Sequence, residues 1–135
     1  MLLLALPKKS AKRKKDDPVY KKVCDEIDEE YKFGGDYTLC FFCWKPIRGF
    51  IEHHHFRGRV GDYYTDKRYI VPGHWLCHTV IWHTYTMAKL KVQSWYQGFK
   101  SRLYRLDPVS YAKLIYREEK YAKKKTGSHD KGSRG

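Results

Sequence analysis

Two short pairs of metal-binding residues constrain this chain more than any other feature. Cys40 and Cys43 form a C-x-x-C turn, and His74 and Cys77 repeat the same spacing further along the chain. A C-x-x-C turn lets two thiolates converge on one tetrahedral Zn²⁺, and a second pair closes the coordination shell. Simple burial would account for Cys40 and Cys43, because free cysteine is often buried, but it leaves the pairing of His74 with Cys77 unexplained. The sequence therefore predicts a structural zinc site that ties two distant segments together.

The length and charge indicate one small, basic domain. A chain of 135 residues suits a single compact domain with a small core. Lysine and arginine number 28 against 15 aspartate and glutamate, a net charge of +13, so nucleic acid is the natural partner. A merely solvated, self-repelling surface is the alternative. Part of this charge surrounds the cysteine and histidine pairs, at Lys45, Arg48, Arg57, Arg59, Lys67 and Arg68.

The two ends of the chain differ in composition from its middle. Residues 1–16 hold an apolar stretch that stops at Pro7 and then a basic run, which predicts a flexible arm and neither a transmembrane helix nor a signal peptide. Residues 123–135 are rich in lysine, glycine and serine, the composition of a disordered basic tail. A single domain is expected over residues 17–122, with its core in residues 39–83.

Cysteine usage indicates a reducing compartment. Three of the four cysteines fit the metal pairs, and Cys24, alone in a helical segment, has no evident partner, so we expect no disulfides. We expect a protein of the cytoplasm or nucleoid, including that of a virus-infected host cell, and not a secreted one.

A first helix is expected over residues 17–34, with Asp17 as its N-cap and Pro18 in its first turn. This helix is predicted to be scaffold rather than site. Its apolar stripe consists of Val19, Val23, Ile27 and Tyr31.

Two strands and a helix are expected to enclose the metal pairs. Residues 50–56 and 68–71 have the composition of strands. Pro72 and Gly73 break the second strand, and residues 74–88 follow as a helix. The prediction is a ββα unit wrapped on metal, and the fold class is α+β.

The C-terminal third predicts further helices. Residues 92–106 are aromatic and basic, and Asp107-Pro108 restarts a helix that runs to about residue 120. Aromatic side chains of this kind can stack on bases, but packing in the core is the favoured interpretation. The aromatic residues concerned are Trp95, Tyr96, Phe99 and Tyr104.

Three strings of residues between positions 39 and 83 resemble one family of nucleases. They are His54-His55-Phe56, then Gly58-Arg59, then Ile70-Val71-Pro72-Gly73-His74-Trp75-Leu76-Cys77-His78. In this order and spacing they resemble the HNH, or His-Me finger, endonucleases, and most of all the phage-type members with a zinc knuckle. The resemblance implies a small zinc-stabilised ββα-metal core flanked by an N-terminal helix and C-terminal helices. It also implies an enzyme that hydrolyses phosphodiester bonds in DNA.

The resemblance implies a role for each matching residue. His54 would hold a catalytic divalent cation, Mg²⁺ or another, and His78 would complete that metal site. His55 would be the general base. The structural zinc would be held by Cys40, Cys43, His74 and Cys77.

The chemistry of phosphodiester cleavage fits these residues. The reaction needs a base to deprotonate water and a cation to neutralise the leaving oxygen, and an ordinary histidine pKa near about 6.5 suits His55 as that base. Successive residues of a strand face opposite sides, however, so His54 and His55 share one site only if the strand twists or ends there. We therefore expect a distortion at this point.

Four basic residues are candidates for contacts with nucleic acid, since arginine binds phosphate oxygens in a bidentate way. Arg59 is favoured, also as a catalytic residue, because the family pattern has an arginine there. An ordinary surface position is the alternative for Arg57 and for Arg59. The candidates are Arg57, Arg59, Lys67 and Arg68.

The chain departs from the family pattern at three positions. His74 stands where the family usually has a cysteine. The asparagine that orients the general base falls at Tyr69, so the Tyr69 hydroxyl or Arg68 would have to take over as a catalytic residue. Many relatives carry another histidine four residues after the counterpart of His78, whereas here His83 is five residues on. At about 100° per residue, His83 lies about 140° around an α-helix from His78, so we expect His83 to be structural.

Two other arrangements of the histidines stay open. His74 and His78 are i and i+4 on one helix, a spacing that presents two imidazoles to one ion, but the glutamate that metalloproteases carry between them is missing. His53 would replace His54 if the strand register slipped by one residue.

Two functions are carried forward. The first is a metal-dependent HNH endonuclease that acts on DNA, with RNA as the alternative substrate and with a two-fold dimer compatible with paired-strand cleavage. The second is a zinc-binding module that binds DNA or RNA without cutting it. The loss of the asparagine favours the second function, and the set of His54, His55 and His78 opposes it.

Overall fold

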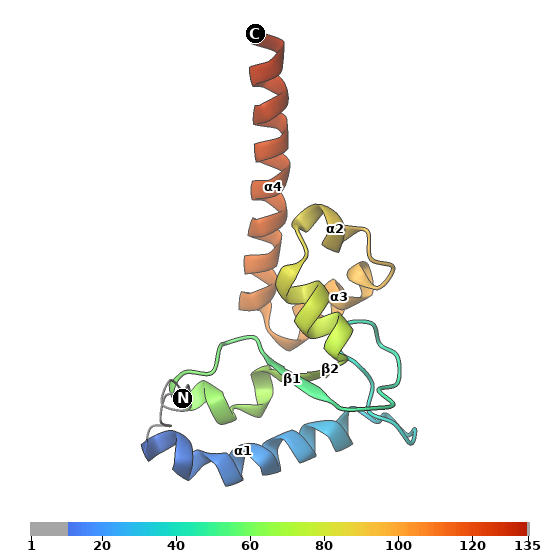
Figure 1. Ribbon diagram of the computed structural model, residues 1–135, viewed down its shortest axis with the longest axis vertical. Helices are drawn as coiled ribbons and strands as arrows, with labels where there is room; N and C mark the ends of the chain where they lie inside the picture. The colour runs from blue at the N-terminus through green and yellow to red at the C-terminus, as the bar shows by residue number, and fades with distance from the viewer. Residues whose placement is uncertain (1–10, 135) are drawn as a thin grey trace, which may run out of the picture.

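The computed structural model describes the backbone of residues 11–134 and the side chains of residues 17–124. The chain is a small α+β protein, as predicted, with a two-stranded antiparallel sheet among helices (Figure 1). In chain order the elements are α1 (Ala11–Glu30), β1 (Glu52–His55), the 3₁₀ helices η2 (Gly61–Thr65) and η3 (Lys67–Tyr69), β2 (Ile70–Gly73), the π-helix η4 (Leu76–Trp82), α2 (Met87–Lys91), α3 (Tyr96–Leu106) and α4 (Pro108–Arg134).

The sheet pairs β1 with β2 in a regular antiparallel register. His54 lies opposite Val71, and His55 lies opposite Ile70. Both predicted strands exist, but β2 continues through Pro72 and Gly73, which were expected to break it. Gly73 packs closely here, because a Cβ atom at this position would lie only 3.1 and 3.2 Å from two atoms of the buried Phe42 ring and would displace that ring slightly.

Helix α1 lies along the sheet, but its bounds and buried face differ from the prediction. The helix begins at Ala11 rather than Asp17 and ends at Glu30, so part of the expected flexible arm is helical and residues 1–10 of that arm lie outside the described residues. The lysine, arginine and alanine residues before Asp17 are good helix formers, which accounts for the earlier start.

The apolar stripe of α1 is rotated by one residue in its first half. Val19 is 51% exposed, whereas Ile27 is buried as predicted. Tyr20 and Cys24 occupy the inward positions and continue the spacing toward Ile27 and Tyr31. Cys24 is therefore part of the core rather than an isolated thiol.

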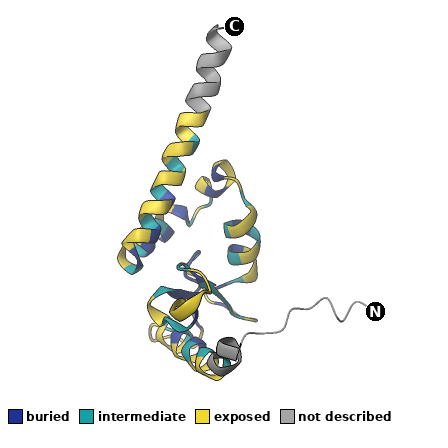
Figure 2. Cartoon of the chain, turned by 90° about the vertical axis from the view of Figure 1, so that its left-hand side faces the viewer, coloured by how far each residue is buried: buried dark blue, intermediate teal, exposed yellow. Residues whose placement is uncertain are grey.

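The aromatic core is centred on Phe42, the second residue between the knuckle cysteines. Its ring is fully buried and stacks on Phe99 at 5.2 Å between centroids, with Trp82 5.9 Å away. Tyr96 and Phe99 of α3 are also fully buried, so the prediction that these aromatics pack in the core is confirmed for them, while Tyr104 is exposed. Figure 2 shows the buried residues gathered between the helices and the sheet.

Helix α4 begins where predicted, directly after Asp107, but continues to Arg134. It passes through the segment 123–135 that was expected to be disordered and projects away from the rest of the chain (Figure 1). Residues 117–125 consist mostly of arginine, glutamate and lysine, which are good helix formers, whereas the glycine and serine residues after them give no local reason for the helix to continue. Among the helices that the structure describes, none combines the length and the apolarity that a membrane span needs.

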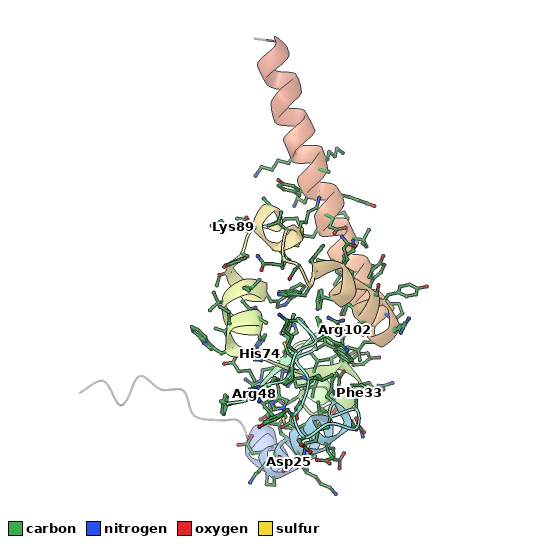
Figure 3. All side chains as sticks on the ribbon, turned by 90° about the vertical axis from the view of Figure 1, so that its right-hand side faces the viewer. Asp25, Phe33, Arg48, His74, Lys89 and Arg102 are labelled. Atoms are coloured by element: carbon green, nitrogen blue, oxygen red, sulfur yellow. The ribbon has the colours of Figure 1, made fainter. Side chains whose placement is uncertain are left out.

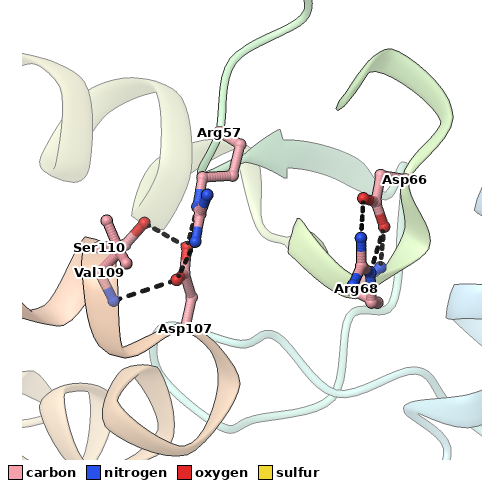
Figure 4. Close-up of polar contacts among 6 residues, drawn as sticks. All are labelled: Arg57, Asp66, Arg68, Asp107, Val109 and Ser110. Carbon is pink, nitrogen blue, oxygen red and sulfur yellow. Dashed lines mark hydrogen bonds and ion pairs between the residues drawn. The ribbon is translucent and has the colours of Figure 1, made fainter. Parts of the chain in front are cut away.

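Arg57 and Asp107 join the end of β1 to the start of α4. The Arg57 Nε and Nη2 atoms donate to the two Asp107 oxygens at 2.7 and 2.8 Å (Figure 4). Asp107 is only 1% exposed and is also the N-cap of α4, because its carboxylate accepts from the Val109 N–H and the Ser110 hydroxyl. The Arg57 guanidinium, together with the Ser110 bond, holds the pKa of Asp107 well below its usual range.

We expect Asp107→Ala to destabilise the fold by at least about 1 kcal/mol, the usual cost of losing an N-cap. Asp107→Asn keeps a capping side chain but loses the charge. Because the folded-state pKa of Asp107 is lowered, its stabilising contribution is present above about pH 4, the unfolded value, and is lost as the pH falls below it. Denaturant unfolding between pH 7 and pH 3 should show a shallower acid limb for Asp107→Asn than for the parent. Asp25→Asn, at an exposed position of α1, is the control, and an unchanged limb in Asp107→Asn would contradict this assignment.

Candidate metal centres

The predicted knuckle residues come together in one cluster. One donor atom from each of Cys40, Cys43, His74 and Cys77 lies within 4.8 Å of the others. The cysteine turn is closed by backbone bonds from the Trp44 N–H to the Cys40 carbonyl at 2.8 Å and from the Cys40 N–H to the Lys45 carbonyl at 2.9 Å. The other pair stands where β2 leads into η4, so the cluster joins the turn to this junction.

His74 is oriented for metal binding by its second ring nitrogen. Its Nε2 atom lies 3.0 Å from the Pro46 carbonyl oxygen and can only donate there, which leaves Nδ1 as the unprotonated donor. Nδ1 lies 3.3 Å from the Cys43 sulfur and 3.9 Å from the Cys77 sulfur. This arrangement is the one expected of a zinc ligand held by an outer hydrogen bond.

The three thiols are coupled to one another. Hydrogen bonds from the Cys43 and Cys77 thiols lower the pKa of Cys40, and hydrogen bonding to Cys40 raises the pKa of Cys43 and of Cys77. Metal ligation requires thiolates, so Cys40 already favours the ligating form, whereas an ion has to displace the protons of Cys43 and Cys77. Three sulfurs and one imidazole in two short pairs fit a structural zinc ion.

A second cluster consists of three histidines from two elements. His54 projects from β1, whereas His78 and His83 come from η4 and the residue after it. His54 Nδ1 and His83 Nε2 each lie 3.0 Å from His78 Nε2, and all three nitrogens lie within 4.8 Å of one another. The predicted pair of His54 and His78 therefore has a third member.

The expectation that His83 faces about 140° away from His78 was wrong, because the helix is not an α-helix at this point. The His83 N–H donates to the His78 carbonyl, an i→i+5 bond that widens the turn. A residue five positions on then faces the same side, whereas an α-helix would turn it about 140° away. The π-helix thus compensates for the extra residue between the two histidines.

Glu52 orients the histidine cluster, and the sequence reasoning missed it. Its Oε1 atom lies 3.0 Å from His78 Nδ1 and accepts from the Thr79 hydroxyl at 2.6 Å. A carboxylate behind a ligating histidine fixes the ring and raises its basicity. Glu52 is two residues before His54 on the same strand face, so the period of the strand could have identified it.

The electrostatics favour the neutral, cation-binding form of His54 and His83. Burial, and then the neighbouring His78 and His83, hold the pKa of His54 well below its ordinary value. Burial and His78 also lower the pKa of His83. Protons and a metal ion compete for the same nitrogens, so at neutral pH the nitrogens of His54 and His83 are available to an ion.

His55 faces the opposite side of β1 from His54. The expected distortion is absent, since both residues pair regularly with β2. The His55 ring is buried nearly parallel to those of Tyr20 and Tyr64, at 5.5 and 6.3 Å between centroids. Its Nε2 atom is enclosed and has no hydrogen-bond partner within the described part of the chain. Burial and then the nearby Arg59 lower the pKa of His55 to about 4, so the ring is neutral near pH 7.

His53 and His74 are each accounted for, so neither open alternative is realised. His53 Nε2 lies 2.7 Å from an Asp28 oxygen on α1, away from His78. Burial lowers the pKa of His53, but hydrogen bonds with Asp28 and Cys24 outweigh it and raise the pKa to about 9. His74 and His78 belong to different clusters.

Three of the four predicted phosphate contacts have acidic partners within the fold. Arg57 binds Asp107, Arg68 binds Asp66 through two nitrogens at 3.0 and 2.8 Å (Figure 4), and Lys67 lies 2.8 Å from a Glu30 oxygen. The guanidinium and ammonium groups that were predicted to contact phosphate are therefore engaged in ion pairs within the fold.

Arg59 lies beside the rings that cover His55, the predicted base, whereas Tyr69 lies beside Arg57. The Arg59 guanidinium lies 5.7 and 5.4 Å from the rings of Tyr20 and Tyr64, beside His55. The Tyr69 ring instead lies under Arg57, 4.3 Å from its guanidinium carbon. The Tyr64 backbone, and not the Tyr69 side chain, hydrogen-bonds to His55.

A cavity of about 220 Å³ opens beside the histidine cluster. His54, His55 and Trp82 line one side, and Lys113 and Arg117 from α4 line the other. Both α4 residues are exposed basic side chains. No sequence motif connects α4 with β1, so only the tertiary structure brings them together.

Comparison of the chain with protein-family models, with curated proteins and with solved structures found no match.

The two clusters predict two classes of bound metal. We expect Cys43→Ser to remove the knuckle ion and to destabilise the whole fold, because the knuckle joins the core segments. His83→Ala should remove only the ion of the histidine cluster. Metal-to-protein ratios after loading with Co²⁺, together with the absorption bands of cobalt–thiolate bonds, distinguish the sites. His53→Ala, which changes a histidine outside both clusters, should keep both ions, and loss of thiolate bands in His83→Ala would contradict two independent sites.

Proposed function

We propose that this protein is a metal-dependent endonuclease of the HNH type, with a structural zinc knuckle and a ββα-metal core. The proposal is carried by the convergence of His54, His78 and His83 on one face of β1, with the neutral His55 on the opposite face and its Nε2 atom without a hydrogen-bond partner among the described residues. The net charge of +13 adds an affinity for polyanions. DNA is the proposed substrate, with RNA as the alternative.

In the proposed mechanism each residue has one task. An ion held by the three histidines would act as a Lewis acid on the scissile phosphate and neutralise the leaving oxygen. His55, neutral at pH 7, accepts the proton of the attacking water through Nε2. Arg59, beside His55, holds a phosphate oxygen. Because Nε2 is enclosed under Tyr20 and Tyr64, substrate binding must displace part of this cover.

The donor set favours transition metals over Mg²⁺. Mg²⁺ prefers oxygen ligands and keeps much of its water shell, whereas imidazole suits Zn²⁺, Ni²⁺ and Co²⁺. Three imidazoles supply all the protein donors of this cluster. We therefore propose a nitrogen-preferring divalent cation in the catalytic site, in place of the Mg²⁺ that the sequence suggested first.

A zinc-binding module that holds nucleic acid without cutting it is the second candidate. The enclosure of His55 and the position of Tyr69 away from it favour this function. The ready-made histidine cluster with its supporting Glu52 opposes it, because a binding module needs no second cation site.

A supercoiled-plasmid assay tests the nuclease directly. We expect nicking with added Ni²⁺ or Co²⁺, weaker nicking with Mn²⁺ or Mg²⁺, and a loss of about 10²- to 10⁴-fold in His55→Ala, the usual contribution of a general base. His53→Ala, which changes the neighbouring, partly buried histidine, controls for effects of strand packing. If the folded parent binds plasmid, RNA and branched DNA but cuts none of them, the binding-module function replaces the nuclease.

The cavity beside α4 predicts a second effect on the substrate. Lys113→Ala and Arg117→Ala should each weaken DNA binding and lower the slope of log K against log salt by about 1, the value for one lost phosphate contact. The rate at saturating substrate should change little, because neither side chain belongs to the histidine cluster. Lys120→Ala, further along the same helix, is the matched control, and equal losses in all three variants would indicate only non-specific charge.

A further inference from the structure

A second cavity, beside the knuckle turn and apart from the histidine cluster, is lined by exposed aromatic rings and two arginines. It has a volume of about 270 Å³ and is bounded by Tyr31, Phe33, Trp44, Arg102 and Arg105. Phe33 is 65% exposed and Trp44 is 38% exposed, and their ring centroids lie 5.2 Å apart. In Figure 3, Phe33 and Arg102 lie toward the right of the view, and His74 and Arg48 lie to their left.

Both exposed rings belong to residues with an energetically unfavourable backbone conformation. Phe33 has φ of 46° and Trp44 has φ of 61°, the left-handed region that bulky residues rarely occupy. The knuckle turn requires this conformation at position 44, where glycine would adopt it freely. A tryptophan here adds strain of about 1–2 kcal/mol and exposes apolar surface. Such strain together with exposure indicates a side chain that is kept for a contact rather than for packing.

The arginines complete a site for a planar, anionic group. Arg102 donates to the Phe41 and Phe42 carbonyls at 2.8 and 2.6 Å, which fixes its guanidinium 4.7 Å from the Trp44 ring. Arg105 is exposed at the cavity edge and makes no hydrogen bond or ion pair with any side chain that the structure describes. The site thus offers π-faces for stacking and positive charge for a phosphate.

We propose that this cavity, which we call the Phe33–Trp44 pocket, binds an unstacked nucleobase of a single-stranded nucleic-acid segment. Stacking of bases on aromatic rings, with arginine beside the backbone, is the general mode of single-strand recognition. Bases within a duplex are stacked on each other and cannot enter such a pocket. The proposal rests on the proposed function, and it specifies a substrate with unpaired nucleotides, such as a branched or gapped strand, rather than a continuous duplex.

The test compares Phe33→Ser with Phe50→Ser in the full chain, each in a His55→Ala background so that no strand is cut. Phe50 is 83% exposed and does not line the pocket, so it matches Phe33 in chemistry and exposure. Zinc content and thermal unfolding establish that both variants are folded. The probes are a fluorescein-labelled oligothymidine, a duplex of the same length, and an acidic peptide that contains tryptophan, each followed by fluorescence anisotropy.

We expect Phe33→Ser to raise the Kd for the single strand by about tenfold, within the range of about 1–3 kcal/mol for one stacked base. Its Kd for the duplex should stay unchanged, and Phe50→Ser should match the parent on every probe. Arg105→Gln should weaken single-strand binding as well and lower its salt dependence.

Two outcomes would contradict base binding in the Phe33–Trp44 pocket without contradicting the proposed function. One is single-strand binding that does not depend on Phe33, and the other is an equal loss on single strand and duplex. Binding of the peptide that Phe33→Ser abolishes, without an effect on DNA, would assign the pocket to a protein partner and overturn this proposal. Failure of the parent to bind any nucleic acid would overturn both the pocket and the proposed function.

Discussion

The convergence of Cys40 and Cys43 with His74 and Cys77 is the constraint on which the rest of the structure depends. It holds the turn between the cysteines against the junction of β2 and η4. Phe42, carried between the cysteines, is thereby placed in the core at 6.0 Å from the rings of both His54 and His78. Because Gly73 leaves room for that ring, the zinc knuckle and the histidine cluster share one packing unit. The position of the second cluster follows from the first.

The side-chain periodicity of β1 and of η4 determines which histidines lie together. On β1 the alternation of side chains sends His53 and His55 toward α1 and His54 toward η4, so neighbouring residues have opposite surroundings. On the helix the π-turn brings His78 and His83 to one face. One imidazole set is thereby assembled for a cation, while His55 is kept neutral and apart from it. A reaction that uses both faces must take place where β1 ends, near Phe56 and the cavity beside α4.

Local spacing was enough to predict the two metal-binding pairs, the two strands and the Asp107-Pro108 helix start, because each pair or element depends on residues close in sequence. The role of His83 could not be predicted, since an α-helical period was the reasonable assumption and the π-turn is imposed by tertiary packing. The pairing of Arg57 with Asp107 joins residues fifty positions apart, and a basic residue followed by a turn gives no local sign of it. Strand periodicity could have identified Glu52, because Glu52 lies two residues before His54 on the same face of β1.

The knuckle turn has two working faces, because its successive residues point in different directions. Phe42 points inward under His54 and His78, and Trp44 points outward into the Phe33–Trp44 pocket. Arg102 connects the two, since it binds the carbonyls of Phe41 and Phe42 and also covers the Trp44 ring. A ligand that shifts Trp44 would therefore act on the same backbone that positions Phe42. Two adjacent segments of the turn thus serve the aromatic pocket through Trp44 and the histidine cluster through the ring contacts of Phe42, and a zinc ion that holds the turn would support both.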